Sequence, residues 1–329
     1  MATTGWMPLR TRALATFSRL TSTPVDALTP AQIKKVRAAT VPLTAPFTWV
    51  TGPVGDNVVS HTRYVTVRDG HRVRIRVHRP LDATEPLPLL MHFHGGGFVI
   101  GNLQTYEPLT TRIAAQARVV VVTVNYRKAP EYVAPLAAYD CIDVTEWAVA
   151  NAADLGARSD SFGVTGDSAG GNLAAVVAQT MRDRGESGLR HQALVYPAPD
   201  LTEHELEHLD RVFPILTPQM MLAFRAMYLG SEDIDGADWL LSPARGRLEG
   251  LPPALLQTAE HDPLRDDGIA YGLALRDAGV EVRMTTYRGA PHGFQTFTGL
   301  TSAGSPALEE LVGEVRHHLH APVMSEAAR

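Results

Sequence analysis

A serine flanked by glycines is the clearest candidate for catalysis in this sequence. Residues 166–170 read Gly-Asp-Ser-Ala-Gly, a G-x-S-x-G pattern with Ser168 at its centre. The pattern follows a strand-like segment at 162–165 and precedes a helical pattern at 173–182. A sharp strand-to-helix turn exposes a serine hydroxyl at the edge of a sheet, and glycines remove the Cβ clashes that such a turn creates. The context therefore predicts that Ser168 is a nucleophile.

A glycine-rich loop fits the second requirement of this chemistry. Residues 94–97 read His-Gly-Gly-Gly and follow the apolar run at 87–93. When an alkoxide attacks an ester carbonyl, negative charge develops on the carbonyl oxygen, and backbone N–H groups aimed at that position stabilise it. Glycines allow the main chain to come that close. We therefore expect the N–H of Gly95 or Gly96, or both, to act together with the N–H of Ala169 at a helix N-terminus.

The base that activates Ser168 is expected late in the chain. A serine hydroxyl needs a base within hydrogen-bond reach, and in this kind of site the order along the chain is serine, acid, histidine. Thirteen histidines compete for the role. His292 follows the predicted strand at 280–287, in a loop that can carry its imidazole to the edge of the sheet beside the nucleophile. His292 is therefore the predicted base.

The acid that orients this base is expected in a stretch crowded with carboxylates. Asp262 follows the predicted strand at 254–258 and precedes a proline, which biases it away from helix and towards a strand-edge loop. Glu260, Asp266 and Asp267 are rivals, but the last two resemble the first turn of the next helix, where acidic side chains are favoured. Asp262 is therefore the predicted acid.

Together these groups predict hydrolysis of an ester in two steps. His292 accepts the proton of Ser168 and later donates it to the departing alkoxide, while Asp262 fixes the tautomer of the imidazole and stabilises the imidazolium. Water then repeats the sequence on the acyl-enzyme. This chemistry requires neither a metal ion nor an organic cofactor, and the expected partner is a small-molecule ester.

The elements that must position these residues alternate between strands and helices. This alternation predicts an α/β fold with a central, mostly parallel sheet of eight strands flanked by helices. Apolar and polar residues alternate at 64–67 and 73–77, which indicates half-exposed antiparallel strands. The other strands are predicted at 87–93, 119–124, 162–165, 193–196, 254–258 and 280–287, and helices at 111–116, 136–149, 173–182, 267–277 and 307–319.

Two segments, residues 1–50 and 201–240, do not fit this alternation. Residues 1–20 carry scattered arginines without the apolar block and cleavage site of a signal peptide, and we interpret them as a surface or cap helix. The second segment has a stripe of three methionines and a phenylalanine at 220–227. This stripe could be ordinary core packing, or it could line a substrate pocket, since Met-rich surfaces adapt to varied ligands.

The motifs together resemble the hormone-sensitive-lipase-like family of α/β-hydrolase carboxylesterases. Beside the motifs at 94–97 and 166–171, residues 126–131 read Tyr-Arg-Lys-Ala-Pro-Glu, close to the Y-R-x-A-P-E of that family. Residues 262–266 read Asp-Pro-Leu-Arg-Asp, close to its D-P-L-x-D. The similarity covers roughly residues 64–319. It implies the α/β-hydrolase fold with a helical cap, and hydrolysis of short- to medium-chain carboxylic esters.

The resemblance also implies a division of the chain. The hydrolase core would comprise residues 51–200 and 241–329, and the cap would comprise residues 1–50 and 201–240. By similarity the catalytic triad would be Ser168, Asp262 and His292, and the oxyanion donors would be Gly95, Gly96 and Ala169. Since such a cap covers the serine and shapes the ester pocket, the candidate lining residues are Phe213, Met221, Phe224 and Tyr228.

Three other functions stay open. His204, Glu205 and His208 match H-E-x-x-H, which on a helix would bind zinc with the glutamate as base, although few apolar residues surround the motif to bury a helix. A non-enzymatic small-molecule receptor is the second, but receptors on this fold have lost the catalytic histidine, whereas His292 is present. The third is an amide or lactone hydrolase, because the same triad serves those substrates.

A group of histidines also occurs at the end of the last predicted helix, as His317, His318 and His320. Cationic side chains are favoured at a helix C-terminus. We therefore interpret these histidines as a solvated helix end rather than a ligand cluster, and predict no metal site.

Composition excludes several classes of protein. Thirty Lys and Arg against 35 Asp and Glu give a net charge of −5 without long runs of one sign, which leaves no electrostatic basis for binding nucleic acid. The longest apolar stretches are far shorter than the ~18 residues of a spanning helix, so no membrane span is expected. The single cysteine, Cys141, is predicted to be a packed core thiol and fits a cytoplasmic protein. A homodimer is left open.

Overall fold

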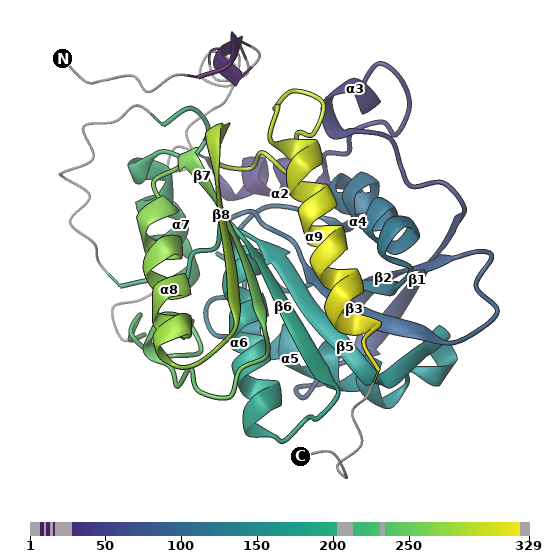
Figure 1. The fold of residues 1–329 in the computed structure, drawn as a ribbon. Coiled ribbons are helices and arrows are strands. Elements are labelled where there is room, and N and C mark those ends of the chain that lie inside the picture. The colour runs from purple at the N-terminus through teal and green to yellow at the C-terminus, as the bar shows by residue number, and fades with distance from the viewer. Residues whose placement is uncertain are drawn as a thin grey trace.

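The computed structural model describes residues 7–9, 11–13, 16, 28–202, 213–230 and 234–322 of the chain. Within these residues, eight strands form one twisted sheet with helices on both faces, which confirms the predicted fold class (Figure 1). The strands are β1 (Val58–Thr66), β2 (Arg72–Pro80), β3 (Leu87–Phe93), β4 (Val120–Asn125), β5 (Ala157–Asp167), β6 (Leu189–Val195), β7 (Ala254–His261) and β8 (Val282–Pro291).

The pairing of the strands brings the sequence motifs to one edge. The order is β1-β2-β4-β3-β5-β6-β7-β8. The pairs β1–β2 and β2–β4 are antiparallel, as predicted, and every pair from β4 to β8 is parallel. Parallel strands present their C-terminal ends at the same edge, where open α/β sheets bind ligands. β3, β5, β7 and β8 each end at or directly before one of the predicted motifs.

Helices cover the sheet in two layers. α4 (Leu103–Ala117) and α9 (Gly304–Leu319) pack on one face, and α5 (Leu136–Ala150), α6 (Ala169–Asp183) and α8 (Arg265–Asp277) pack on the other. In Figure 1 the yellow α9 crosses in front of the sheet and α5 and α6 lie behind it. The remaining helices are α2 (Pro30–Ala38), α3 (Thr48–Thr51), α7 (Pro218–Leu229) and the short η2 (Ala153–Leu155) and η4 (Pro243–Arg245).

Successive residues of the central strands face two different cores. Leu90 of β3 belongs to the core under α4 and α9, whereas Leu89 and Met91 belong to the core on the opposite face. Because both faces are covered, the central strands read as continuous apolar runs. Cys141 of α5 is fully buried in the second core, which confirms its prediction as a packed thiol.

Several elements are longer than the sequence pattern predicts, among them β1, which begins at Val58 rather than at 64. β5 begins at Ala157, whereas the sequence predicts a start at 162. Residues 158–160 are polar and partly exposed, and the pairing register shifts beside them, so this part of the strand lacks the apolar pattern. α4 begins at Leu103, after the N-cap Asn102, rather than at 111. Pro108 lies inside this helix, and a proline in a helical pattern predicts a break. For β5 and α4 the sequence predicts the correct type of element, but the predicted first residue is wrong.

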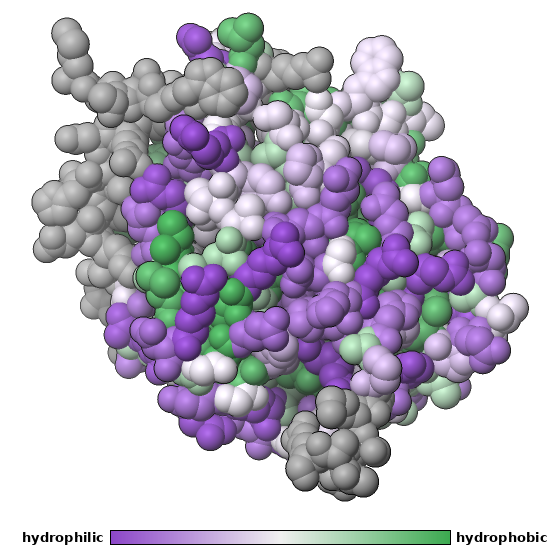
Figure 2. Space-filling model, in the orientation of Figure 1, coloured by the Kyte–Doolittle hydropathy of each residue, from purple (hydrophilic) through white to green (hydrophobic). Residues whose placement is uncertain are grey.

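The surface is consistent with the composition. The face drawn in Figure 2 is largely hydrophilic, and its apolar side chains gather over the region of α8 and β8. Among the helices that the structure describes, none is long and apolar enough to cross a membrane.

α2 and α7 come from the two segments that interrupt the alternation. Arg37 of α2 donates a hydrogen bond through Nε to the carbonyl of Val99 at 2.6 Å and pairs through Nη1 with Glu131 at 2.8 Å. These contacts hold α2 against the residues that follow the glycine-rich loop. α7 begins after the N-cap Thr217, whose hydroxyl accepts a hydrogen bond from the N–H of Met220. The contacts of Arg37 therefore place α2 near the edge of the sheet that carries the motifs.

Candidate active site

Ser168 occupies a strained turn between β5 and α6. Its φ angle is 56°, in the region where L-residues are rare, which turns the chain sharply from the strand into the helix. A Cβ atom on Gly166 would overlap the carbonyl of Gly170, and one on Gly170 would overlap the carbonyl of Phe93 in β3. The glycines of the motif are therefore required by close backbone packing, as the sequence predicts.

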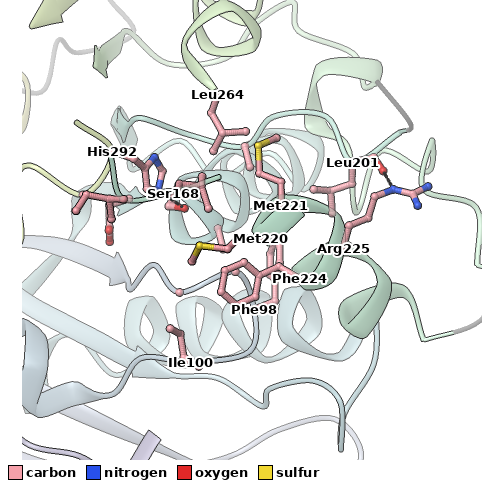
Figure 3. A pocket seen from close by; sticks show the side chains of 18 of the residues that line it. Phe98, Ile100, Ser168, Leu201, Met220, Met221, Phe224, Arg225, Leu264 and His292 are labelled. Carbon is pink, nitrogen blue, oxygen red and sulfur yellow. Dashed lines mark hydrogen bonds between the residues drawn. The ribbon is translucent and has the colours of Figure 1, made fainter. Parts of the chain in front are cut away.

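The structure brings the three predicted side chains into one hydrogen-bonded chain. His292 Nε2 lies 3.0 Å from Ser168 Oγ, and His292 Nδ1 lies 2.6 Å from Asp262 Oδ2. Figure 3 shows the imidazole of His292 directed at Ser168 over the pocket. The Asp262 side chain is fully buried, and that of His292 is 10% exposed. In this geometry the imidazole can take the serine proton while the carboxylate fixes which ring nitrogen carries hydrogen.

Neighbouring groups explain why Asp262 is the carboxylate in contact with His292. The N–H of Leu264 donates a hydrogen bond to Asp262 Oδ1 at 2.9 Å, which orients the carboxylate. Glu260 instead accepts a hydrogen bond from the N–H of Gly289 at 2.7 Å, which anchors the end of β8. Asp266 and Asp267 lie in the first turn of α8, as predicted. The rivals therefore have other contacts.

The N–H of Gly95 is hydrogen-bonded to two side chains. It donates to Asp167 Oδ1 at 2.8 Å and lies 3.0 Å from the hydroxyl oxygen of Tyr106. This N–H therefore already has acceptors, whereas an oxyanion donor needs an N–H that is free to bind the substrate oxygen. Gly96 and Gly97, with φ angles of 121° and 58°, line the pocket beside Ser168. Ala169 is the first residue of α6, so its N–H has no acceptor within the helix.

The buried side chain of Asp167 holds the glycine-rich loop, a role that the sequence does not predict. Asp167 accepts hydrogen bonds from Gly95, from the Tyr106 hydroxyl at 2.9 Å and from the Tyr196 hydroxyl at 3.4 Å. Burial raises the pKa of Asp167 to about 6, although the hydrogen bonds from Tyr106 and Gly95 act in the opposite direction. Burial also raises the pKa of both tyrosines well above the usual value. Ser168 thus follows a carboxylate that is tied to the loop opposite it.

His94 supports the same loop. Its Nδ1 lies 2.8 Å from the carbonyl oxygen of Gly95, and its ring stacks on Tyr126 at a centroid distance of 4.4 Å. The Tyr126 hydroxyl donates to the carbonyl of His94 at 2.7 Å. Burial lowers the pKa of His94 well below its usual value, so the imidazole is neutral at pH 7.

An apolar pocket of about 270 Å³ opens beside Ser168 (Figure 3). Met221 and Phe224 of α7 line it, as predicted, and Met220 joins them, so this part of the apolar stripe faces the pocket. Phe213 and Tyr228 are buried but do not lie among the lining residues. Tyr228 instead stacks on the lining residue Phe98, at a centroid distance of 3.9 Å, and so supports the wall from behind.

One charged side chain of the lining turns away from the serine. Arg225 Nε donates a hydrogen bond to the carbonyl of Leu201 at 2.6 Å, and Figure 3 shows the guanidinium on the far side of the pocket from Ser168. The space beside the serine is therefore bordered mainly by carbon and sulfur. The H-E-x-x-H residues His204, Glu205 and His208 lie outside the described residues.

The fold and the site together define the class of protein. The profile of a family described by the alpha/beta hydrolase fold matches residues 90–296, which span every motif from the glycine-rich loop to His292. The chain belongs to this family, and its resemblance to the hormone-sensitive-lipase-like carboxylesterases is confirmed.

Individual relatives carry the comparison further. The chain is 38% identical over 259 residues to carboxylesterase NlhH of Mycobacterium tuberculosis, covering 76% of this chain and 79% of that protein. It is 32% identical over 240 residues to an arylesterase of Saccharolobus solfataricus, covering 72% of this chain and 78% of that protein. Its fold is similar to that of a hyperthermophilic esterase from the archaeon Pyrobaculum calidifontis, with a TM-score of 0.82, 33% identity, and 95% and 98% of the two chains covered.

Proposed function

We propose that this protein is a serine carboxylesterase that hydrolyses short- to medium-chain carboxylic esters through an acyl-enzyme. The observation that carries the proposal is the continuous hydrogen-bonded chain from Ser168 through His292 to Asp262, with lengths of 3.0 and 2.6 Å. The relatives named carboxylesterase and arylesterase support the same activity. A receptor that only binds small molecules has no need for this pairing.

The proposed reaction begins with attack of Ser168 Oγ on the ester carbonyl while His292 Nε2 takes the hydroxyl proton. The tetrahedral intermediate collapses when His292 returns that proton to the departing alkoxide. Water then attacks the acyl-enzyme with His292 again as base, and Ser168 is released with the carboxylic acid. Asp262 stays ionised and stabilises the imidazolium that forms in each half of the cycle.

The proposed oxyanion donors are the N–H groups of Gly96, Gly97 and Ala169. Gly96 comes from the predicted set, and Gly97 replaces Gly95 because the Gly95 N–H is bonded to Asp167. All three proposed donors line the pocket that contains Ser168. Fixed N–H groups in such a site stabilise the developing charge without having to reorganise during the reaction.

The proposed substrate range follows from the pocket. Its volume of about 270 Å³ is close to the lower end of the ~300–1,000 Å³ that ligand pockets usually have, and its lining beside the serine is mainly apolar. Both features favour short- to medium-chain acyl groups without charge. The space beyond Gly97 is closed by Phe224, since a Cβ on Gly97 would overlap the Phe224 ring. Amides and lactones remain alternatives, because the triad serves them too.

The proposed division of the chain places a cap in residues 1–50 and 201–240, and the core in residues 51–200 and 241–329. The support is that α7 supplies Met220, Met221 and Phe224 to the pocket, whereas no described residue between 28 and 50 lines it. The second cap segment is therefore the one proposed to select the substrate. A cytoplasmic location and a homodimer stay predictions.

An ester series tests the proposed function. Purified protein is assayed with p-nitrophenyl esters of increasing acyl length, with and without a serine-directed phosphonate. Turnover should be greatest for the shorter acyl chains and should be abolished by the phosphonate, with labelling of Ser168 detected by mass spectrometry. A protein that binds the esters without turnover would instead be a receptor.

A further inference from the structure

A buried histidine without a hydrogen bond lies between the sheet and the last helix. His191 of β6 is 0% exposed, and neither of its ring nitrogens has a hydrogen-bond partner among the residues that the structure describes. A neutral imidazole carries one N–H donor and one acceptor, and leaving both unpaired in a protein interior costs free energy. A buried polar group without a partner in a native protein needs an explanation, and one possible explanation is a bound ion.

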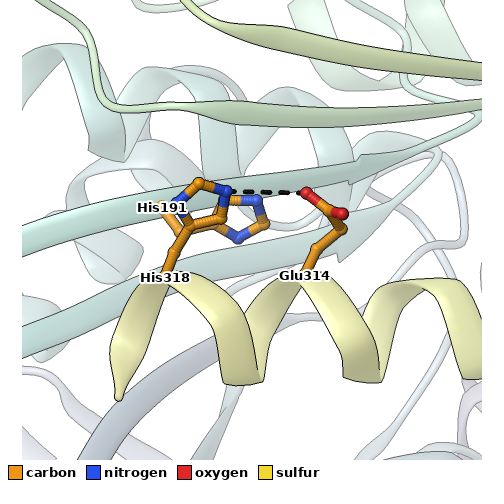
Figure 4. A group of neighbouring side chains, drawn as sticks. All are labelled: His191, Glu314 and His318. Carbon is orange, nitrogen blue, oxygen red and sulfur yellow. Dashed lines mark ion pairs between the residues drawn. The ribbon is translucent and has the colours of Figure 1, made fainter. Parts of the chain in front are cut away.

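Two further metal-ligating side chains face His191 from α9. Glu314 and His318 are four residues apart, so they project from the same side of the helix. Figure 4 shows both side chains directed from α9 towards His191. His318 stacks on His191 at a centroid distance of 4.6 Å, and its Nε2 lies 3.5 Å from Glu314 Oε2. One ligand atom from each of the three side chains lies within 4.8 Å of the other two.

We propose that His191, Glu314 and His318 bind a divalent transition-metal ion of the zinc class. Two imidazoles and one carboxylate are ligands that Zn²⁺ takes in proteins, with a fourth position left for water. Mg²⁺ and Ca²⁺ prefer sets made of oxygen ligands, so two imidazoles select against them. The sequence predicts that the histidines at this helix end are solvated. This prediction fits His317, which is exposed, but not His318, whose side chain is only 13% exposed.

Burial and one ion pair set the surroundings of the three ligands. Neither ring nitrogen of His191 has a hydrogen-bond partner among the described residues, so a lone pair of this imidazole is free to bind an ion. Arg283 pairs with Glu314 Oε1 at 3.1 Å, which orients the carboxylate and leaves Oε2 on the side of His318. Metal binding requires neutral imidazole and ionised carboxylate.

A modest movement of His318 completes the site. Zn–N bonds of about 2.0–2.1 Å in tetrahedral geometry place ligand atoms roughly 3.3 Å apart. The ligand atoms here must therefore approach by up to about 1.5 Å from their present limit of 4.8 Å. Imidazole nitrogens bind metals in the plane of the ring, so His318 must turn out of its stack on His191. His318 is the ligand near the helix end and can turn, whereas His191 is fixed in the core.

The proposed ion would act on stability rather than on catalysis. His191 lies near the start of β6, whereas Ser168 follows the end of the neighbouring β5, so the two sites are at opposite ends of the parallel strands. Bridging β6 to α9 fastens the last helix to the sheet. An ion that binds only the folded state stabilises that state by mass action.

Zinc titration of the purified, chelator-treated full chain tests the proposal. Calorimetry with ZnCl₂ should show one tight site per chain and a rise in Tm, and MgCl₂ should produce neither. Glu314→Gln and His318→Ala should each weaken zinc binding by at least ~10-fold and remove the rise in Tm, since each deletes a ligand. His317→Ala, the next residue of the same helix, is the matched control and should retain both.

Two results would overturn the site. One is the absence of saturable zinc binding by the native chain. The other is zinc binding that survives in Glu314→Gln and His318→Ala, or that is lost in His317→Ala, because the ion would then bind elsewhere. Circular dichroism of the metal-free variants distinguishes a lost ligand from a lost fold, and both substituted side chains lie partly at the surface.

Discussion

Two buried histidines of this protein have opposite surroundings. Both nitrogens of His292 are engaged, by Ser168 at 3.0 Å and by Asp262 at 2.6 Å. Neither nitrogen of His191 has a partner among the described residues. An imidazole held on both sides has a defined tautomer, so the nitrogen that faces the serine can accept and return a proton, which is what a catalytic base requires. An imidazole with an unengaged lone pair is suited to be a ligand. Burial alone therefore does not indicate a role, and the hydrogen-bond partners do.

Substitutions of the engaged histidine and its serine should produce the largest effect. Ser168→Ala and His292→Ala should each lower kcat for a p-nitrophenyl ester on the order of 10⁵–10⁶-fold, and the double variant should lose little more, because the two groups act as a unit. Steady-state kinetics on the three variants measures this. Losses that multiply would show that the two side chains work independently.

The acid that orients His292 should give the next largest effect. Asp262→Asn should lower kcat on the order of 10⁴-fold with folding retained, because the amide can no longer hold the productive tautomer. Asp266→Asn is the matched control, since Asp266 is mostly exposed and pairs with Arg265. It should keep substantial activity. The reverse ranking would assign the acid to Asp266.

Asp167, which lies between the serine and the loop, should make the free energy of unfolding depend on pH. Burial raises its pKa to about 6 from an unfolded value of 3.8, so the native state binds more protons within that window. The free energy of unfolding of the native chain, relative to Asp167→Asn, should therefore fall as pH rises from about 4 to about 6, by up to about 3 kcal/mol. Denaturant titrations across this range measure the difference. Parallel curves would contradict the raised pKa.

The unpaired histidine should produce the smallest effect when metal is absent. Replacing a buried polar group that has no partner by an apolar one deletes no hydrogen bond, so His191→Leu in chelator-treated protein should lower the free energy of unfolding by less than about 1 kcal/mol. His94→Leu is the contrasting variant, because His94 bonds the carbonyl of Gly95. It should destabilise by about 1–3 kcal/mol. Equal losses measured by chemical denaturation would remove the distinction between paired and unpaired histidines.

Much of the fold could be predicted because its signals are local. Buried parallel strands read as apolar runs, and a glycine-flanked serine between a strand and a helix marks a sharp turn. The predicted starts of β5 and α4 were wrong, since polar residues 158–160 and Pro108 carry the opposite local signal. Tertiary packing overrides these signals, because neighbouring elements supply contacts that a short window of sequence does not contain.

Other features depend on contacts between distant segments. The N–H of Gly95 is bonded to Asp167, 72 positions away, so the choice of oxyanion donors within the glycine run was not accessible from the run itself. Tyr228 follows the same helical pattern as Phe224, yet it stacks behind Phe98 while Phe224 faces the pocket. His191 and His318 lie on different elements, and only the packing of α9 on the sheet brings their rings together.

The sequence by itself determined the chemistry that this chain can offer: a serine in a sharp turn, a glycine-rich loop, and an acid and a histidine placed after late strands. Backbone propensity and apolar periodicity act over a few residues, so they can be read along the chain. The tertiary structure decided which polar groups meet. That outcome depends on burial and hydrogen bonding between segments far apart in sequence, and it separates the engaged His292 from the unpaired His191.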